Sequence, residues 1–248
     1  MTMVYSKRFY RSGLCPAGMT SFRVSVKETD LWIAVEEHAY HTELPQQVEQ
    51  LVWSLRRQLE KYILQEPYFA KTMHPVLVDA GAPMLVQEMV RAGNRAGVGP
   101  MAAVAGAFAQ RTGEWLRQHS GQVIVENGGD IFCCTQDCLR VGVFAGASPF
   151  SGRLSIRVEP QAEPRGICTS SGTVGPSHSE GRADAAIIVA SCTLLADAVA
   201  TATANSIQWA GDLENSLQLA KTLPEVSGVL AILGDKMAAW GDIQLEQV

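Results

Sequence analysis

The segment "SFRVSVKETDLWIAVEE", residues 21–37, constrains the fold most strongly. It alternates apolar and polar residues in two runs that are separated by a short polar stretch. Alternation with a period of two is typical of a strand with one buried face, and two adjacent runs of this kind predict a hairpin. We therefore predict a β-hairpin with one face in water and with its connection at residues 28–30.

A long amphipathic helix is predicted directly after the hairpin, where it would cover the sheet. Apolar residues recur at helical spacing over residues 44–66, Pro45 suits the first turn, and Pro67 lies just past a plausible end. Two more helices are predicted at residues 84–93 and 99–121. The first half of the last one consists almost entirely of small residues, which indicates that another element packs closely against its backbone.

The second half of the chain mixes strands and helices without strict β–α–β alternation. Strands are predicted at residues 122–126, 140–146, 153–160, 184–191 and 227–234, and helices at residues 193–208 and 213–223. This order favours an α+β fold over a parallel α/β fold. The chain contains no internal repeat and no low-complexity linker, so we predict a single domain over residues 1–248.

Charge and hydropathy argue against two classes of partner. The formal net charge is −5 and the basic residues are scattered, whereas a nucleic-acid-binding surface needs clustered Lys and Arg. No apolar run reaches membrane-spanning length, and the first residues lack the apolar core of a signal peptide. We therefore expect a cytoplasmic protein with neither a nucleic-acid nor a membrane partner.

The cysteines fit a reducing compartment. Cys133, Cys134 and Cys138 cluster after a strand-like run, while Cys15, Cys168 and Cys192 are isolated. A zinc site would normally show two Cys-x-x-Cys pairs or Cys/His pairs, and this chain shows neither. We predict a structural role for the cysteines.

The stretch "GVGPMA", residues 97–102, matches the dinucleotide-binding pattern G-x-G-x-x-G/A. In that interpretation the glycines would approach a pyrophosphate and Glu126 would bind a ribose. The pattern requires a buried strand immediately before it, however, and the preceding "RAGNRA" is polar. A nicotinamide-dependent oxidoreductase is therefore a minor alternative.

The stretch "VENGGDIF", residues 125–132, allows two interpretations. Its two glycines, Gly128 and Gly129, would let the backbone between Asn127 and Asp130 approach a ligand closely. Alternatively, they form the tight turn of a β-hairpin. The pattern alone favours the hairpin.

Asp197 and Thr201 are the candidate metal ligands. They are four residues apart on a predicted helix, so both side chains lie on one face. A carboxylate and a hydroxyl suit Mg²⁺, with water and a substrate phosphate completing the shell. An Asp near a helix start can instead complement the helix dipole.

The loop "ICTSSGTVGPSHSEGRAD", residues 167–184, is rich in hydroxyl groups and glycine. Such a loop can wrap an anion, most often a phosphate, or it can be an ordinary surface connection. His178 within it is either a general acid or base or an exposed loop residue.

Taken in order, these segments resemble the ApbE superfamily, the flavin transferases that move FMN from FAD onto a protein threonine. The matching stretches are "GVGPMAAVAGAFA", "ENGGDIF", "CTSSGTVG" and "ADAVAT". The longer run from "VENGGDIF" to "ADAVATATAN" is most similar to an uncharacterised, cytoplasmic ApbE-like family that is shorter than the true transferases. The similarity covers most of the chain.

The resemblance implies an ApbE-like α+β fold with two lobes of sheet and helix and a cleft between them. It implies that Asp197 and Thr201 bind Mg²⁺ and that the ligand is FAD, FMN or another phosphate-bearing small molecule. The residues that it places around the nucleotide pocket are Asn127, Gly128, Gly129, Asp130, Thr169, Ser170, Ser171 and Gly172.

Two departures from the transferase pattern affect the expected chemistry. Ala105, beside Gly106, stands where the transferases have a lysine, which removes a charge-assisted contact to phosphate. The segment "SHSEGRAD" stands where they have a "HIIDP"-type segment, and His178 and Asp184 are the candidate catalytic substitutes. The resemblance therefore implies that the metal half of the site is retained and that the transfer half is altered.

Two functions from different classes therefore follow from the resemblance. The first is binding of a flavin nucleotide or similar ligand with Mg²⁺, with metal-assisted phosphoryl or flavinyl transfer or hydrolysis. The alternative is a degenerate, non-catalytic module that carries a ligand or docks a partner. The small-residue helix at residues 102–109 would also suit a homodimer.

Overall fold

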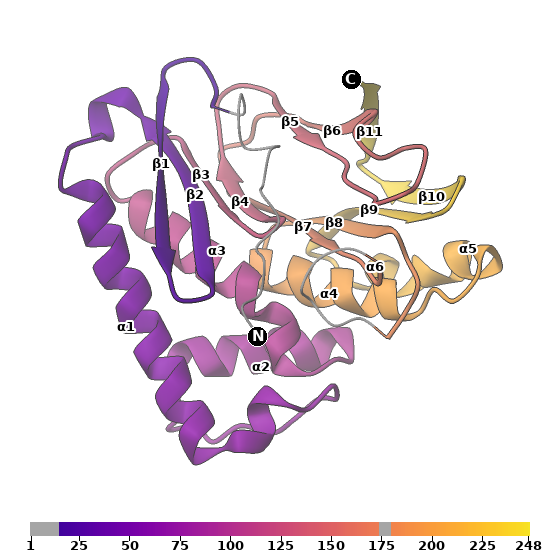
Figure 1. Cartoon of the computed structure of the whole chain (residues 1–248), viewed down its shortest axis with the longest axis horizontal. Helices are drawn as coiled ribbons and strands as arrows, with labels where there is room; N and C mark the ends of the chain where they lie inside the picture. Colours follow the sequence, from indigo (N-terminus) through magenta and orange to yellow (C-terminus); the bar gives the residue numbers. More distant parts are fainter. Residues whose placement is uncertain (1–14, 174–179) are drawn as a thin grey trace.

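The computed structural model describes residues 15–173 and 180–248 (Figure 1). Eight of its strands form one sheet in the order β1-β2-β3-β4-β7-β8-β9-β10, and all neighbouring pairs are antiparallel. A second sheet has three antiparallel strands in the order β11-β6-β5. The predicted α+β class is confirmed.

The elements have the following bounds. The large sheet contains β1 (Met19–Val26), β2 (Thr29–Glu36), β3 (Val123–Asn127), β4 (Asp130–Cys134), β7 (Arg165–Ser170), β8 (Ala185–Ala190), β9 (Val226–Leu233) and β10 (Lys236–Gly241). The small sheet contains β5 (Leu139–Gly142), β6 (Leu154–Val158) and β11 (Gln244–Gln247). The α-helices are α1 (Leu44–Gln65), α2 (Met84–Ala96), α3 (Val104–Leu116), α4 (Thr193–Asn205), α5 (Leu213–Ser216) and α6 (Gln218–Thr222). The 3₁₀ turns are η2 (Glu37–Ala39), η3 (Pro67–Ala70), η4 (Pro100–Ala103) and η5 (Ala210–Asp212).

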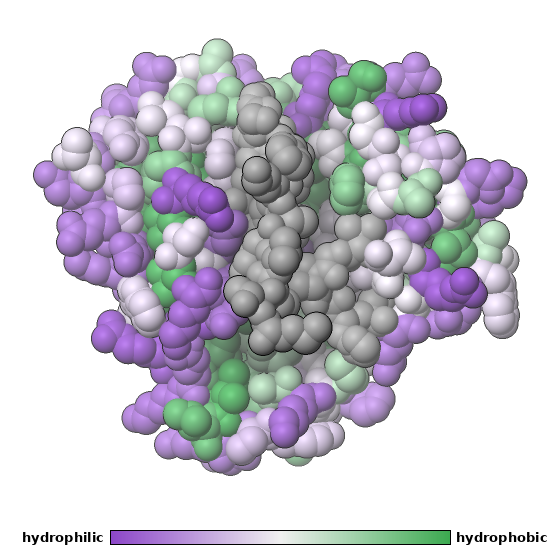
Figure 2. All heavy atoms as spheres, in the orientation of Figure 1, coloured by the Kyte–Doolittle hydropathy of each residue, from purple (hydrophilic) through white to green (hydrophobic). Residues whose placement is uncertain are grey.

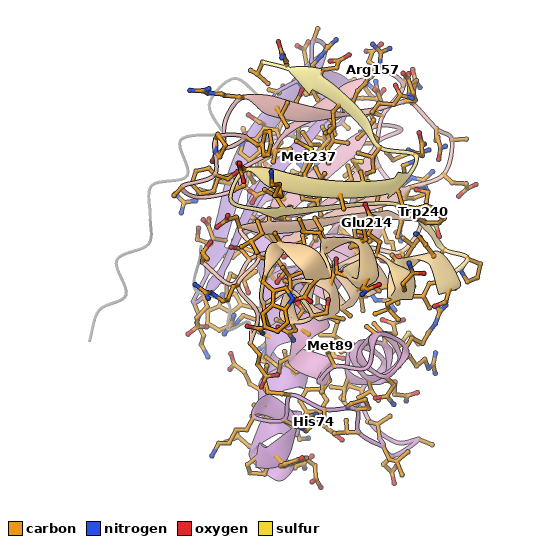
Figure 3. The ribbon with its side chains drawn as sticks, turned by 90° about the vertical axis from the view of Figure 1, so that its right-hand side faces the viewer. His74, Met89, Arg157, Glu214, Met237 and Trp240 are labelled. Carbon is orange, nitrogen blue, oxygen red and sulfur yellow. The ribbon has the colours of Figure 1, made fainter. Side chains whose placement is uncertain are left out.

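The large sheet separates two hydrophobic cores. One core lies between the sheet and the helices, and the other lies between the sheet and the small sheet. Figure 3 shows this layering from the side. The small sheet with Arg157 lies at the top, strand β10 with Met237 lies below it, and helix α2 with Met89 lies lower still. His74 lies below all three. Hydrophilic residues dominate the rim of the face seen in Figure 1, and apolar residues form only separate patches on it (Figure 2).

The N-terminal hairpin is present, but two details of its prediction are wrong. Its turn lies at Lys27 and Glu28, where Lys27 has a φ of 52°, rather than at residues 28–30. Strand β2 does not have one face in water, because it lies between β1 and β3 and both of its faces are buried. Ile33 enters the helix-side core, while Trp32 and Ala34 enter the core beneath the small sheet.

The predicted helices are largely confirmed. Helix α1 covers the hairpin with a continuous buried stripe, begins at Leu44 with Pro45 in its first turn, and ends before Pro67. The helix predicted at residues 213–223 is divided into α5 and α6, and the strand predicted at residues 140–146 ends at Gly142. Strands β10 and β11 were not predicted from the sequence, and residues 167–170 of the predicted loop belong to strand β7.

The dinucleotide interpretation of residues 97–102 is wrong. No strand precedes this stretch: Gly97 caps helix α2 with a φ of 75°, and the chain then enters η4. Gly99 is needed for a close approach, since a Cβ there would lie 2.0 Å from the carbonyl oxygen of Thr72. The Glu126 carboxylate accepts a hydrogen bond from the Gly129 amide at 2.7 Å, so it stabilises the turn after β3.

Half of the cysteines are buried, as expected for structural residues, whereas Cys15 is exposed and Cys138 and Cys192 are half-buried. Cys133, Cys134 and Cys168 are buried, and all six thiols are free. Within residues 15–173 and 180–248, no helix is both long enough and apolar enough to cross a bilayer.

Candidate functional site

Helices α3 and α4 cross in close contact at Gly106. A Cβ added to Gly106 would lie 2.6 Å from the carbonyl oxygen of Thr193 and 2.8 Å from the Cβ of Asp197. The predicted close packing on the small-residue helix is therefore confirmed, and its partner is helix α4 of the same chain. This contact accounts for Gly106 without a second subunit.

The two helices cap each other. The Gly106 amide donates to Oδ2 of Asp197 at 2.8 Å, and the Thr193 amide donates to Oε1 of Gln110 at 2.8 Å. Amides in the first turn of a helix have no partner within the helix, so each side chain satisfies donors that would otherwise be unpaired. Asp197 thus lies at the positive end of α3, where a carboxylate is stabilised. The sequence did not reveal Gln110, because its role depends on this crossing.

The "ENGGDIF" segment forms the predicted hairpin turn. Asn127 and Asp130 face each other at the ends of β3 and β4, and Gly128 and Gly129 between them have φ values of 73° and 111°. Two successive positive φ angles explain why both turn residues are glycine. The same turn also reaches helix α3, since Nδ2 of Asn127 donates to the carbonyl of Ala105 at 3.1 Å.

Asp130 and Asp197 are two buried carboxyl groups that influence each other. Their residues are 6% and 8% exposed. Burial raises the pKa of Asp130 well above its usual range, and the charge of Asp197 raises it further. Burial also raises the pKa of Asp197 to about 7, although the amides of Gly106 and Ala105 oppose the shift. Neighbouring buried carboxylates favour a shared proton or a bound cation.

The oxygen atoms of Asp197 and Thr201 suit a hard cation whose remaining coordination positions are filled by a ligand. Thr201 lies one helical turn after Asp197 and is half-buried, so a carboxylate and a hydroxyl face the same side of α4. Among the described residues, no group of three or more His, Cys, Asp and Glu side chains could hold a metal ion. A cation at Asp197 and Thr201 would therefore need further oxygen ligands from water, backbone or a phosphate, as Mg²⁺ commonly has.

Residues at the end of β7 lie beside the hairpin turn. A backbone hydrogen bond from Thr169 to Asp130 partly opposes the rise in the pKa of Asp130. The Thr169 side chain lies next to Gly129, with its Cβ 4.0 Å from the position of an added Cβ. Ser170, the last residue of β7, is buried. The structure thus brings the start of the "TSSG" segment to the turn with Asp130.

Ser171 and Gly172 pack against the segment that leads into β8. The Gly172 amide donates to the carbonyl of Ala183 at 2.9 Å, and the Ser171 hydroxyl donates to the same oxygen at 3.3 Å. A Cβ on Gly172 would lie 2.0 Å from the carbonyl oxygen of Gly181. These contacts give the two residues a structural role in this loop.

Asp184 holds the same loop to the turn between β9 and β10. Its carboxylate accepts hydrogen bonds from the Thr173 hydroxyl at 2.9 Å and from the Gly234 amide at 2.7 Å. These contacts give Asp184 a structural role in the loop, whereas its catalytic role stays a prediction. His178 lies outside the described residues.

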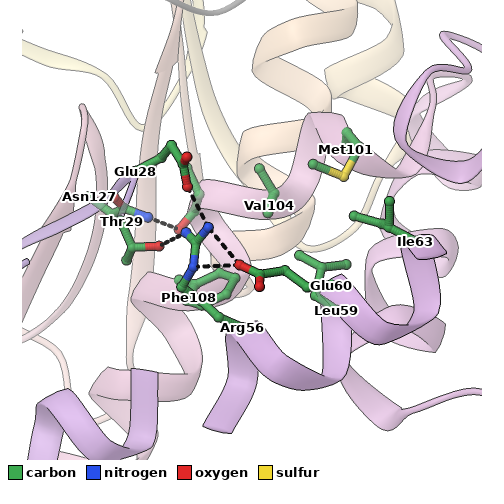
Figure 4. Close-up of a pocket in the computed structure, with 11 residues that line it drawn as sticks. Glu28, Thr29, Arg56, Leu59, Glu60, Ile63, Met101, Val104, Phe108 and Asn127 are labelled. Atoms are coloured by element: carbon green, nitrogen blue, oxygen red, sulfur yellow. Dashed lines mark hydrogen bonds and ion pairs between the residues drawn. The ribbon is translucent and has the colours of Figure 1, made fainter. Parts of the chain in front are cut away.

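A pocket of about 340 Å³ opens beside Ala105 and Asn127 (Figure 4). It lies between the turn of the N-terminal hairpin, helix α1 and the start of helix α3. Its lining residues are Glu28, Thr29, Arg56, Leu59, Glu60, Ile63, Met101, Val104, Ala105, Phe108 and Asn127. The sequence did not indicate this pocket, because Arg56 and Glu60 read as surface positions of an amphipathic helix.

The fold is that of the ApbE flavin transferases. Over 90% of this chain and 94% of the other, it matches the apo form of the Pseudomonas stutzeri flavinyl transferase ApbE with a TM-score of 0.59 at 16% identity. The match to the flavin transferase ApbE from Vibrio cholerae has a TM-score of 0.60 at 12% identity and covers 92% and 98% of the two chains. At these identities the similarity concerns the fold alone.

The family follows from the sequence comparisons. The family model described as "AbpE bacteria" matches residues 12–230, so the chain belongs to this family of ApbE-like proteins. A UPF0280 protein from Methanocella arvoryzae is 41% identical over 191 residues, which cover 77% of this chain and 78% of that protein. The UPF0280 protein Mbar_A3697 from Methanosarcina barkeri is 39% identical over 220 residues, which cover 88% and 85%.

The raised pKa of Asp197 predicts a pH-dependent stability. The folded chain releases this proton near pH 7 and the unfolded chain near the ordinary value of 3.8. The folded state therefore binds the proton more tightly, and the stability that Asp197 contributes is present at low pH and is lost as the pH rises toward 7. We expect the metal-free wild type to lose stability relative to Asp197→Asn over this range.

Thermal unfolding of both proteins in chelator, from about pH 4.5 to about pH 8, measures this difference. Comparison with Asp197→Asn cancels the contributions of carboxylates that do not interact with Asp197, so the difference reports Asp197 together with Asp130, whose pKa the charge of Asp197 raises. A difference in melting temperature that stays constant over the range would contradict the prediction.

Proposed function

We propose that this protein binds a phosphate-bearing small molecule, a flavin nucleotide in the first instance, together with Mg²⁺ held by Asp197 and Thr201. One observation carries the proposal: buried Asp197, whose charge raises the pKa of buried Asp130, accepts the Gly106 amide at the start of helix α3, and Ala105 at the same helix start lines a pocket. The pocket and the carboxylate pair share this helix start, since Ala105 lines the pocket and its amide faces Asp197.

The pocket suits the ring system of such a ligand. Leu59, Val104 and Phe108 give it apolar walls, and Thr29 and Asn127 supply polar groups at its edge. Small-molecule sites commonly combine a mainly apolar lining with a few polar groups that fix orientation. A ring held here would point its phosphate groups along the start of α3 toward the carboxylate pair.

A bound Mg²⁺ would neutralise the buried carboxylates and polarise the oxygens of a phosphate. Asp130 and the Gly128–Gly129 turn would border the phosphate, with Thr169 beside them. Proteins of this fold include the flavinyl transferase from Pseudomonas stutzeri. We therefore propose metal-assisted flavinyl or phosphoryl transfer, or hydrolysis, as the reaction class.

A non-catalytic ligand carrier is the second candidate. Ala105 favours it, because a methyl group stands at the pocket wall where the resemblance implies a lysine. The hydrogen bonds of Asp184 within its own loop favour it as well, since they occupy both carboxylate oxygens. Product analysis separates the candidates: turnover of FAD with Mg²⁺ by the wild type, lost in Asp197→Ala, would exclude the carrier.

The proposal is tested by thermal shift with FAD, FMN, ADP and NAD, each with and without Mg²⁺. A ligand that binds the native state raises its melting temperature by mass action. We expect stabilisation by FAD that is larger with Mg²⁺ than without it. Stabilisation by none of the four, at concentrations that saturate ordinary nucleotide sites, would overturn the proposal.

A further inference from the structure

Arg56 is a fixed cation in the wall of the pocket. It projects from helix α1, and its side chain is only 14% exposed. Its Nη1 donates to Oγ1 of Thr29 at 2.8 Å and its Nε donates to Oε1 of Glu60 at 3.1 Å, while Nη2 pairs with Glu28 (Figure 4). Among the described residues that line the pocket, Arg56 is the one basic residue.

The acidic partners of Arg56 differ in how firmly they are held. Glu60 lies one helical turn from Arg56, is 36% exposed and also accepts a hydrogen bond from Lys27 at 2.6 Å. Glu28 is 73% exposed and belongs to the two-residue hairpin turn, next to Lys27 with its positive φ. Thr29 and Glu60 therefore fix the guanidinium, and Glu28 reaches it from the solvent side.

An exposed carboxylate of this kind is easily exchanged. Ion pairs with a solvent-exposed partner contribute little to stability, because the charge is well hydrated when the pair opens. A guanidinium, in contrast, binds phosphate oxygens strongly through its planar set of donors. A ligand phosphate in the pocket could thus take the place of Glu28 on a guanidinium that is already oriented.

We infer that Arg56 binds a phosphate group of the ligand and that Glu28 is the internal carboxylate that this phosphate displaces. The inference rests on the proposed function and specifies its substrate class. One phosphate would lie at the Mg²⁺ between Asp197 and Thr201 and a second at Arg56, so the site selects ligands with a diphosphate, such as FAD or ADP, over monophosphates such as FMN or AMP. Arg56 would thereby supply the positive charge that position 105 lacks, because residue 105 is alanine where the resemblance implies a lysine.

The test is calorimetric titration of ADP and AMP, in the presence of Mg²⁺, into wild type, Glu28→Gln, Arg56→Gln and Arg56→Lys. Glu28→Gln removes the competing charge, so we expect it to bind ADP about threefold to tenfold more tightly and to leave AMP affinity unchanged. Arg56→Gln is expected to remove the preference for ADP over AMP, and Arg56→Lys to retain part of it.

Glu49→Gln is the matched control, because Glu49 is an exposed glutamate of helix α1 that does not line the pocket. It changes the net charge equally and is expected to leave both affinities unchanged. Thermal unfolding verifies that each Arg56 variant is folded, and Glu28→Gln tests the inference independently of them.

The outcomes separate this inference from the proposed function. If the wild type binds ADP with Mg²⁺ but Glu28→Gln and Glu49→Gln bind it equally, the displacement of Glu28 by a phosphate is wrong while the proposed function stands. A tightening in Glu28→Gln that is the same for AMP and ADP would likewise overturn the diphosphate selection. If the wild type binds none of ADP, AMP, FAD and FMN with Mg²⁺, both fail.

Discussion

Gly106→Ala is expected to lower the free energy of unfolding by about 3 kcal/mol, since overpacking a tight helix crossing is among the costlier single changes. The new methyl group would lie 2.6 Å from the carbonyl oxygen of Thr193 and 2.8 Å from the Cβ of Asp197. The first of these atoms is backbone and cannot rotate away. The helices must separate, and the hydrogen bond from the Gly106 amide to Asp197 lengthens.

Chemical denaturation of wild type and variant measures this loss. Gly142→Ala is the control, because Gly142 has open space around the added Cβ and an ordinary backbone conformation. It is expected to be neutral or slightly stabilising. Equal losses in the two variants would show that the crossing of α3 and α4 is not as tight as described.

Asp197→Ala is expected to weaken Mg²⁺-dependent binding of FAD at least about tenfold, because a hard cation loses its carboxylate ligand. The same variant leaves the amides at the start of α3 without their acceptor, so a structural effect accompanies the loss. Asp197→Asn separates the two effects. Its amide oxygen can still accept from Gly106, whereas its missing charge removes the attraction for the cation.

Calorimetric titration of FAD at several Mg²⁺ concentrations measures the effect. Asp235→Ala is the control, because the Asp235 side chain is 77% exposed and its nearest salt-bridge contact, to Lys236, is long at 3.8 Å. If Asp197→Asn binds FAD with the Mg²⁺ dependence of the wild type, Asp197 serves only to cap helix α3.

Elements with a strong local pattern could be predicted from the sequence. Helix α1 carries its apolar stripe and Pro45 in its own residues, and Pro67 follows its end. The Gly128–Gly129 turn follows from the dihedral freedom that only glycine has. The buried second face of β2 could not be predicted in this way. Trp32 and Ala34 are covered because a second sheet packs on that side, which is a tertiary effect.

In the candidate site, too, local features could be predicted from the sequence and tertiary contacts could not. Asp197 and Thr201 share a helix face, so their proximity follows from spacing alone. The contacts that give Asp197 its environment come from Gly106 and Asp130, which lie far away along the chain and meet it only through the α3–α4 crossing and the sheet order. Arg56 was missed for a similar reason, since its partners Glu28 and Thr29 meet it only when helix α1 docks on the hairpin turn.

The most direct test of a metal-dependent phosphate site is to locate the metal. Crystals grown with ADP and Mn²⁺, an anomalous scatterer that replaces Mg²⁺, would give the position of the ion independently of the nucleotide density. We expect an anomalous peak at coordination distance from the oxygens of Asp197 and Thr201, with a phosphate of ADP as a further ligand. A crystal with ordered ADP in the pocket and no anomalous peak at these two residues would contradict this expectation.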